Sequence, residues 1–179
     1  TVTLDATGNG SITAAQVGSA STDNCAIASM SLSQTAFNCS HISTATPPTD
    51  LFISEYVEGS SNNKSIEIYN GTGAAVNLTT GGYQIRVFLI CLTSATIINL
   101  AGIIADGDVF VVSNTLANAA ILSQSDQTSG SISFNGDDAV ALTKNGAAGT
   151  FVDIFGSIGT DPGTAWTQSG NTTLDRTLR

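Results

Sequence analysis

The sequence predicts an all-β protein whose main part is an antiparallel sandwich or barrel. Apolar and polar residues alternate in runs such as SIEIY, DVFVV and SISF, which is the period of a strand with one buried face. Turn-forming stretches such as ADGD, NGDD and KNGAAG separate these runs. The strands follow one another with almost no helical periods between them, and that order favours antiparallel sheets packed face to face.

A proline-containing linker at residues 44–50 is predicted to separate two regions. Its sequence, TATPPTD, places two prolines in a polar run, and proline lacks an amide donor and holds the chain extended. Residues 1–43 before it contain about three predicted strands, too few to close a sandwich, since such domains run to about 100 residues. We therefore expect this segment either to pack onto the second domain or to be completed by another chain.

Residues 51–179 are predicted to form the sandwich. A hairpin is expected over 54–70, SEYVEGSSNNKSIEIYN, because a Gly/Ser/Asn loop joins two alternating runs. A short helix or turn is expected over 113–124, SNTLANAAILSQ, which begins with residues that favour a helix N-cap. Cys91 lies in the apolar run VFLICL and is expected in the core.

Composition disfavours nucleic acid and membrane surfaces as direct partners. Five basic residues face fourteen acidic ones, for a net charge of -9, whereas phosphate and anionic lipid attract clustered Lys and Arg. Only 11% of the residues are charged, against a usual share of about 25%. No apolar run reaches the roughly 20 residues that a transmembrane helix needs. This composition is typical of an extracellular, secreted or cell-surface protein.

The cysteines suggest an oxidising compartment. Cys25 and Cys39 flank a segment that holds two short strands and a turn, so we predict a disulfide between them; two small buried side chains are the alternative. The chain has no CxxC motif and a single histidine, which argues against a zinc site.

Catalysis is not expected. Glu55 and Glu67 fall at equivalent places in the predicted hairpin, as in a pair of hydrolytic carboxylates. Both alternate with apolar residues, however, which is typical of the polar face of a sandwich strand, and Glu67 is expected to bind backbone or Lys64. The single histidine, His41, comes without a GxSxG motif, so a nucleophilic triad is not predicted.

Calcium is the one cofactor that the motifs allow, and no other is predicted. In LDATGNG, Asp5 and Asn9 stand at the first and fifth positions of a calcium-loop pattern, but its twelfth position is Gln16, which favours a plain polar turn. Asp137 and Asp138 in NGDD are better candidates, because adjacent carboxylates repel each other unless a cation or arginine neutralises them. Asn-Gly and Asp are also ordinary turn residues.

Residues 51–179 resemble the lamin tail domain family in its bacterial secreted form. The likeness is carried by LFISEYVEGSSNNKSIEIYNGTG, INLAGIIADGDVFVVSN, the FNGDDAV region, FVDIFGSIGTDPGTAW and NTTLDRTLR, in this order. The resemblance implies an immunoglobulin-like β-sandwich without a catalytic centre. In such relatives the domain is commonly appended to extracellular nucleases, other secreted hydrolases and large surface proteins.

Residues 1–43 resemble part of the immunoglobulin-like repeats of giant bacterial adhesins. TVTLDATGNGSITAAQV and STDNCAIASMSLSQTAFNCS carry this likeness, but the closing strands of such a repeat do not follow. The fold expected for the whole chain is therefore an immunoglobulin-like sandwich preceded by an incomplete immunoglobulin-like unit.

The function predicted is that of a non-enzymatic structural or adhesive module of a bacterial surface or secreted protein. In its sharper form the protein is a fibre subunit that self-associates by β-strand addition, because exposed strand edges recruit further strands. The alternatives are an accessory domain of a secreted hydrolase, such as an extracellular nuclease, and a module that binds calcium or surface glycans. The aromatic residues suited to glycans are scattered: Tyr56, Tyr69, Tyr83 and Trp166.

Overall fold

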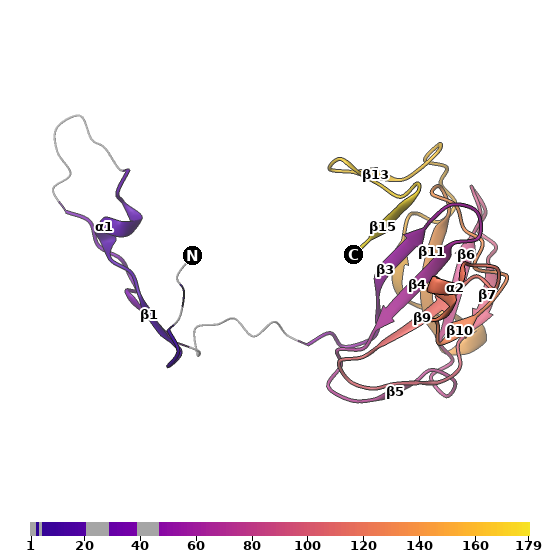
Figure 1. Cartoon of the computed structure of the whole chain (residues 1–179), viewed down its shortest axis with the longest axis horizontal. Helices are drawn as coiled ribbons and strands as arrows, with labels where there is room; N and C mark the ends of the chain where they lie inside the picture. The colour runs from indigo at the N-terminus through magenta and orange to yellow at the C-terminus, as the bar shows by residue number, and fades with distance from the viewer. Residues whose placement is uncertain (1–2, 4, 21–28, 39–46) are drawn as a thin grey trace. The chain divides into compact units, whose positions relative to one another are not determined.

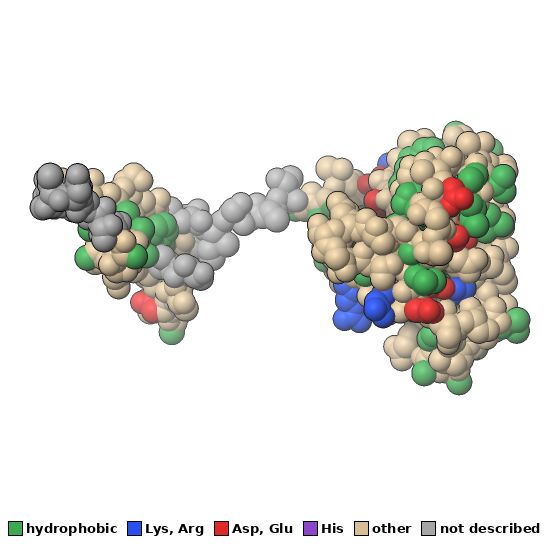
Figure 2. Space-filling model, turned by 90° about the horizontal axis from the view of Figure 1, so that it is seen from above, with side chains coloured by type: hydrophobic (Ala, Val, Ile, Leu, Met, Phe, Trp, Pro, Cys, Tyr) green, Lys and Arg blue, Asp and Glu red, His purple; other side chains and the backbone are tan. Residues whose placement is uncertain are grey.

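The computed structural model describes residue 3 and residues 5–20, 29–38 and 47–179. It divides the chain into two compact units, a first unit of Thr1–Thr46 and a second unit of Pro47–Arg179 (Figure 1). Uncharged polar side chains and backbone form most of the surface seen in Figure 2, as expected of a chain in which 11% of the residues are charged.

The first unit contains a short two-stranded ribbon and one helical turn. β1 (Asn9–Ser11) pairs antiparallel with β2 (Ala36–Asn38). The helix α1 (Ala14–Val17) begins with a capping box, in which the Thr13 hydroxyl accepts from the Gln16 amide and the Gln16 side chain accepts from the Thr13 amide. No side chain is buried among the described residues of this unit. A two-stranded ribbon is only marginally stable in water, so these residues form no core of their own.

The second unit is an immunoglobulin-like sandwich of two sheets. The first sheet has the strand order β10-β9-β4-β3-β15. All of its neighbouring strands are antiparallel except the parallel pair β9 and β10. In chain order its strands are β3 (Phe52–Glu58), β4 (Lys64–Tyr69), β9 (Val109–Ser113), β10 (Gln127–Thr128) and β15 (Arg176–Leu178).

The second sheet has the strand order β12-β11-β6-β7 and is antiparallel throughout. Its strands are β6 (Gln84–Phe88), β7 (Thr96–Asn99), β11 (Ala139–Lys144) and β12 (Thr150–Phe155). Two small ribbons complete the unit, β5 (Val76–Asn77) with β8 (Ile103–Ile104), and β13 (Thr167–Gln168) with β14 (Asn171–Thr172). The short helices are α2 (Ala119–Leu122) and the 3-10 turn η2 (Gly146–Ala148).

One hydrophobic core joins the inner faces of the two sheets. Alternate residues of β4 and β9 point inward, as the period of a strand requires, and they meet residues of β6, β7 and β11. Tyr56 lies between two further rings, with its centroid 4.8 Å from that of Phe134 and 4.2 Å from that of Phe155. The inward residues include Ile66, Ile68, Phe110, Val112, Ile85, Val87, Ile98, Val140 and Leu142.

β11 is buried on both of its faces. Val140 and Leu142 belong to the main core, whereas Ala139 and Ala141 form a second cluster with Phe88 on the other side. A strand covered on both faces needs no polar alternation. This explains why AVAL reads as a continuous apolar run.

The short helix or turn expected over 113–124 is confirmed: β9 ends at Ser113, and α2 follows after Asn118, whose side chain caps the helix by accepting from the Ile121 amide. One local expectation from the sequence was wrong. Cys91 is exposed and has a left-handed φ of 60°, because β6 already ends at Phe88 and the apolar run continues into a turn.

Asp50 anchors the beginning of the second unit to the second sheet. Its Oδ1 accepts from the Tyr83 hydroxyl at 2.5 Å and from the Leu51 amide at 2.9 Å, and its Oδ2 accepts from Lys144 Nζ at 2.5 Å. Burial opposes ionisation of this carboxyl, but the bonds from Lys144, Tyr83 and Leu51 outweigh it, so the pKa of Asp50 lies below its ordinary value of 3.8.

The core gives a direct test of the sandwich. Phe134→Ala is expected to lower the free energy of unfolding by about 3–5 kcal/mol, because it removes a fully buried ring that packs on Tyr56. Phe151→Ala on β12 is the matched control, since half of that side chain is exposed and its loss creates little cavity. Urea unfolding followed by tyrosine or tryptophan fluorescence measures both. Equal losses for the two variants would contradict the packing described.

Candidate functional site

Asp138 is a buried carboxylate that ties two turns together. Its Oδ1 accepts from the Ile90 amide at 2.9 Å and its Oδ2 accepts from the Asn135 amide at 2.8 Å. Its main-chain oxygen accepts from the indole Nε1 of Trp166 at 2.9 Å. Burial is the largest influence on the pKa of Asp138 and raises it, and the negative charge of Asp137 raises it further. The hydrogen bonds from the Asn135 and Ile90 amides and the positive charge of Lys64 lower it, but the net pKa stays above its ordinary value. Both carboxylate oxygens therefore serve the fold.

Asp137 is different, because its Oδ1 is buried and has no hydrogen-bond partner among the described residues. A buried carboxylate oxygen without a donor is costly unless a cation or water neutralises it. Within the part of the chain that the structure describes, no group of three or more His, Cys, Asp or Glu side chains is placed to hold a metal ion. Calcium at Asp137 and Asp138 therefore stays a prediction that depends on Asp137.

Asp5 and Asn9 form a self-contained turn. Asp5 Oδ1 accepts from the Thr7 amide at 2.9 Å, the Thr7 hydroxyl at 2.7 Å and the Asn9 amide at 3.0 Å. These bonds lower the pKa of Asp5, with the Asn9 amide as the largest cause. This is the geometry of an Asx turn, and calcium there also stays a prediction. Cys25, Cys39 and His41 lie outside the described residues.

Glu55 and Glu67 stand directly opposite each other in the β3–β4 hairpin, as the sequence predicts. Glu67 accepts from the Ser54 hydroxyl at 2.8 Å, and Glu55 accepts from Arg179 Nε at 2.8 Å. In the described hairpin, Glu67 does not form the expected bond to Lys64. The Lys64 side chain points inward and pairs with Glu58 instead.

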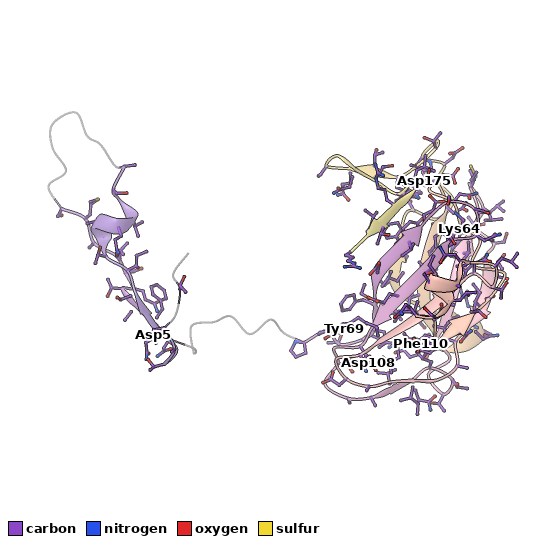
Figure 3. All side chains as sticks on the ribbon, in the orientation of Figure 1. Asp5, Lys64, Tyr69, Asp108, Phe110 and Asp175 are labelled. Carbon is purple, nitrogen blue, oxygen red and sulfur yellow. The ribbon has the colours of Figure 1, made fainter. Side chains whose placement is uncertain are left out.

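Lys64 and Glu58 form a buried ion pair inside the end of the sandwich. Their side chains are only 7% and 5% exposed, and Glu58 Oε2 also accepts from the Asp175 amide at 2.5 Å. Figure 3 shows Lys64 and Asp175 at the same end of the second unit. Removing one partner would leave the other charge buried and alone, which typically costs 3–5 kcal/mol. The pair therefore fixes the segment that leads into β15.

An open groove is lined by residues of β12, of the β13–β14 ribbon and its flanking segments, and of β15. β12 is an edge strand of the second sheet, and β15 is an edge strand of the first. The groove has a volume of about 910 Å³, and Arg179 is the one charged residue among its lining, all of which lies in the described second unit. Its apolar lining residues are Ile154, Phe155, Trp166 and Leu178. We call it the edge groove.

Asp153 marks the point where the edge groove begins. Its Oδ2 accepts from the Ile53 amide on β3 at 2.9 Å, and its Oδ1 accepts from the Ile154 amide on β12 at 2.9 Å. The pairing of β3 with β4 is irregular between Ile53 and Glu55. Before this irregularity, Ile53 of β3 contacts Asp153 of β12, and after it residues 56–58 of β3 pair with β15. Asp153 thus links β3 of the first sheet to β12 of the second sheet beside the edge groove. The outer edges of end strands such as β12 and β15 can accept further strands.

Trp166 forms one wall of the edge groove and is held in place. Besides its bond to Asp138, the indole lies against Gly156, where an added Cβ would be 2.8 Å from Nε1. Gly156 has a φ of 85°, so a side chain there would be strained as well as crowded. Tyr56 and Tyr83 are buried in the core, which removes two of the four aromatic residues suited to glycans. Glycan binding stays a prediction for Trp166 and Tyr69.

The profile of the lamin tail domain family matches residues 44–159, about two thirds of the chain. The match begins within the predicted linker and ends before β13, so β13, β14 and β15 lie beyond it. A search of curated proteins found no match. The resemblance of residues 1–43 to adhesin repeats stays a prediction. No helix in the described residues has the length and apolar character needed to cross a membrane.

The pKa of Asp138 predicts a pH dependence of stability. The native pKa lies above the ordinary 3.8, so near that pH the folded chain holds a proton that the unfolded chain has released. The contribution of Asp138 to the free energy of unfolding therefore falls as pH rises from about 3.8 through the native pKa. Urea unfolding across this range measures the free energy of unfolding of the wild type and of Asp138→Asn. The amount by which the wild type exceeds the variant is expected to shrink as pH rises.

Asp50→Asn is the matched comparison, because the native pKa of Asp50 is lowered. The contribution of Asp50 to the free energy of unfolding is fully present above pH 3.8, and it is lost as pH falls through the native pKa of Asp50. The two variants should therefore show slopes of opposite sign. The same sign for both would contradict the environment described for one of the two carboxyls.

Proposed function

Because the chain belongs to the lamin tail domain family, we propose that it works as a non-enzymatic structural module of a secreted or cell-surface protein. Several acidic side chains of the second unit have structural roles. Glu55 and Glu67 face outward from a hairpin, Asp138 ties two turns, and Glu58 neutralises Lys64. The low share of charged residues supports an extracellular location.

We further propose that the module joins its neighbours by β-strand addition. One observation carries this proposal: no side chain is buried among the described residues of the first unit, whose ribbon has strands of three residues each. Such a ribbon gains stability when further strands cover its edges. Elsewhere in the described part of this unit, Val17 and Met30 are exposed apolar side chains that a neighbour could cover. Strands from a neighbouring subunit would complete the ribbon.

The edge groove is the matching feature of the second unit. Two strand edges border a groove with apolar side chains at its base, so an extended segment bound there gains main-chain hydrogen bonds and pockets for alternate side chains. A contact of this type joins two different surfaces, and its repetition without closure gives a filament. The protein would then be a fibre subunit.

Light scattering tests the assembly. The full chain is expected to form species whose mass grows with concentration, and electron microscopy should show fibres. Pro47–Arg179, which has its own core, is expected to remain smaller at every concentration. Leu178→Lys, placed in the edge groove, should reduce the assembly of the full chain. A monodisperse monomer of the full chain at all concentrations would overturn assembly and leave a non-assembling spacer.

Calcium at the Asp137–Asp138 turn is a second proposal, favoured by the buried Asp137 Oδ1 that has no hydrogen-bond partner among the described residues. Calcium binds hard oxygen ligands, and a ligand that binds only the folded state raises its stability. Millimolar Ca²⁺ is expected to raise the melting temperature of the wild type but not of Asp137→Asn. Asp161→Asn, at an exposed turn, is the control that keeps the shift. No shift in the wild type would overturn calcium binding.

A further inference from the structure

A second groove lies on the outward face of the first sheet. Ile66, Ile68, Phe110 and Val112 point into the core, so the residues that alternate with them on β4 and β9 face outward. Together with β3 and the short helix α2 they enclose about 620 Å³. Asp108, just before β9, lines this groove and is labelled in Figure 3. We call it the acidic groove.

The acidic groove is lined by four carboxylates and by no lysine or arginine, all within the described second unit. Glu55 and Glu67 are half-buried at its base, whereas Asp108 and Asp126 are exposed at its rim. Like charges directly opposite each other on neighbouring strands destabilise a sheet, and Glu55 and Glu67 are such a pair. Arg179 pairs with Glu55; among the described ion pairs none includes the other three. The negative charge of the groove is therefore largely uncompensated.

The groove also has apolar lining residues. Val57 comes from β3, Val109 and Val111 come from β9 on the other side of β4, and Ile121 of α2 adds a fourth aliphatic side chain. Burial of such surface contributes about 25 cal/mol per Å². No aromatic residue lines the groove, which removes the stacking platform that a sugar would use. Its shape and chemistry suit aliphatic stems that end in a positive charge, as in lysine and arginine.

The neighbouring strand edge is already closed, so the groove binds side chains on a sheet face and not an added strand. The Val111 amide donates to Asp126 Oδ2 at 2.8 Å, and the Val111 carbonyl accepts from the Asp126 amide at 2.9 Å. Asp126 thereby occupies the main-chain groups at which another strand would pair with β9.

We propose that the acidic groove binds an extended segment, rich in lysine or arginine, of a different protein. The aliphatic stems lie on the valines, and the cationic heads pair with Glu67, Asp108 and Asp126. Arg179 shows the same contact within the chain, since its Nε donates to Glu55 while its side chain stays 79% exposed. Charge complementarity of this kind gives specificity and speeds association.

A second copy of the chain is a poor occupant. Only five of the 179 residues are basic, and the two lysines are already paired within their own chain, Lys64 with Glu58 and Lys144 with Asp50. The partner is therefore a basic protein that differs from this chain. This site is separate from the edge groove, so it does not depend on strand addition.

Binding of labelled peptides to the full chain tests this proposal by fluorescence anisotropy. One short peptide alternates lysine with valine, and its matched control carries glutamate in place of lysine. The lysine peptide is expected to bind, more weakly as salt rises because the contacts are ionic, and the glutamate peptide should not bind. Glu67→Gln is expected to weaken binding about tenfold, equivalent to about 1.4 kcal/mol. Val111→Lys should abolish it by placing a like charge in the groove.

Asp161→Asn is the control for unspecific attraction, because it removes one negative charge at an exposed turn outside the groove. It should leave the affinity within a factor of about two, and thermal melts should show all variants folded. Equal weakening by Asp161→Asn and Glu67→Gln would overturn the proposal, since only total charge would then matter. Absence of binding by the lysine peptide, or crosslinks of the groove to a second copy, would overturn it too.

Discussion

Burial of alternate side chains from two facing sheets in one core is the constraint on which the rest of the structure depends. Ile66 and Ile68 can be buried only if Ser65 and Glu67 lie on the other side of β4. The positions of the outward groups follow from this alternation. The acidic groove is thus the outer surface of the strands that form the core, and its carboxylates are held by the packing beneath them.

The sandwich also contains charge, and its position explains how it is tolerated. Lys64 and Glu58 point inward at one end of the sandwich, near Asp138, where the turns before β11 and β15 meet. Each of these groups has a charged or amide partner, so burial costs less than it would for an isolated ion. Glu58 and Asp138 hold loops against the ends of strands, since each accepts from main-chain amides.

The sequence predicts the strands far better than it predicts their surroundings. The register of Glu55 with Glu67 follows from alternation and a short loop, both of which are local. Cys91 was misplaced because an apolar run continues beyond the end of its strand, and periodicity does not show where a strand ends. The bond expected between Glu67 and Lys64 does not form because Lys64 lies on the inner face of β4 opposite Glu58, whereas Glu67 lies on the outer face. The grooves combine residues distant in the sequence, so no local pattern reveals them.

The hydrogen bonds between Asp126 and Val111 make the two edges of the first sheet different. One side of that sheet ends in β10, a strand of two residues, with a carboxylate bound to the neighbouring main chain; the other side ends in β15, which borders an open groove. Short and blocked edges resist pairing with foreign strands. A further strand added to this sheet would therefore pair with β15 and not with β10.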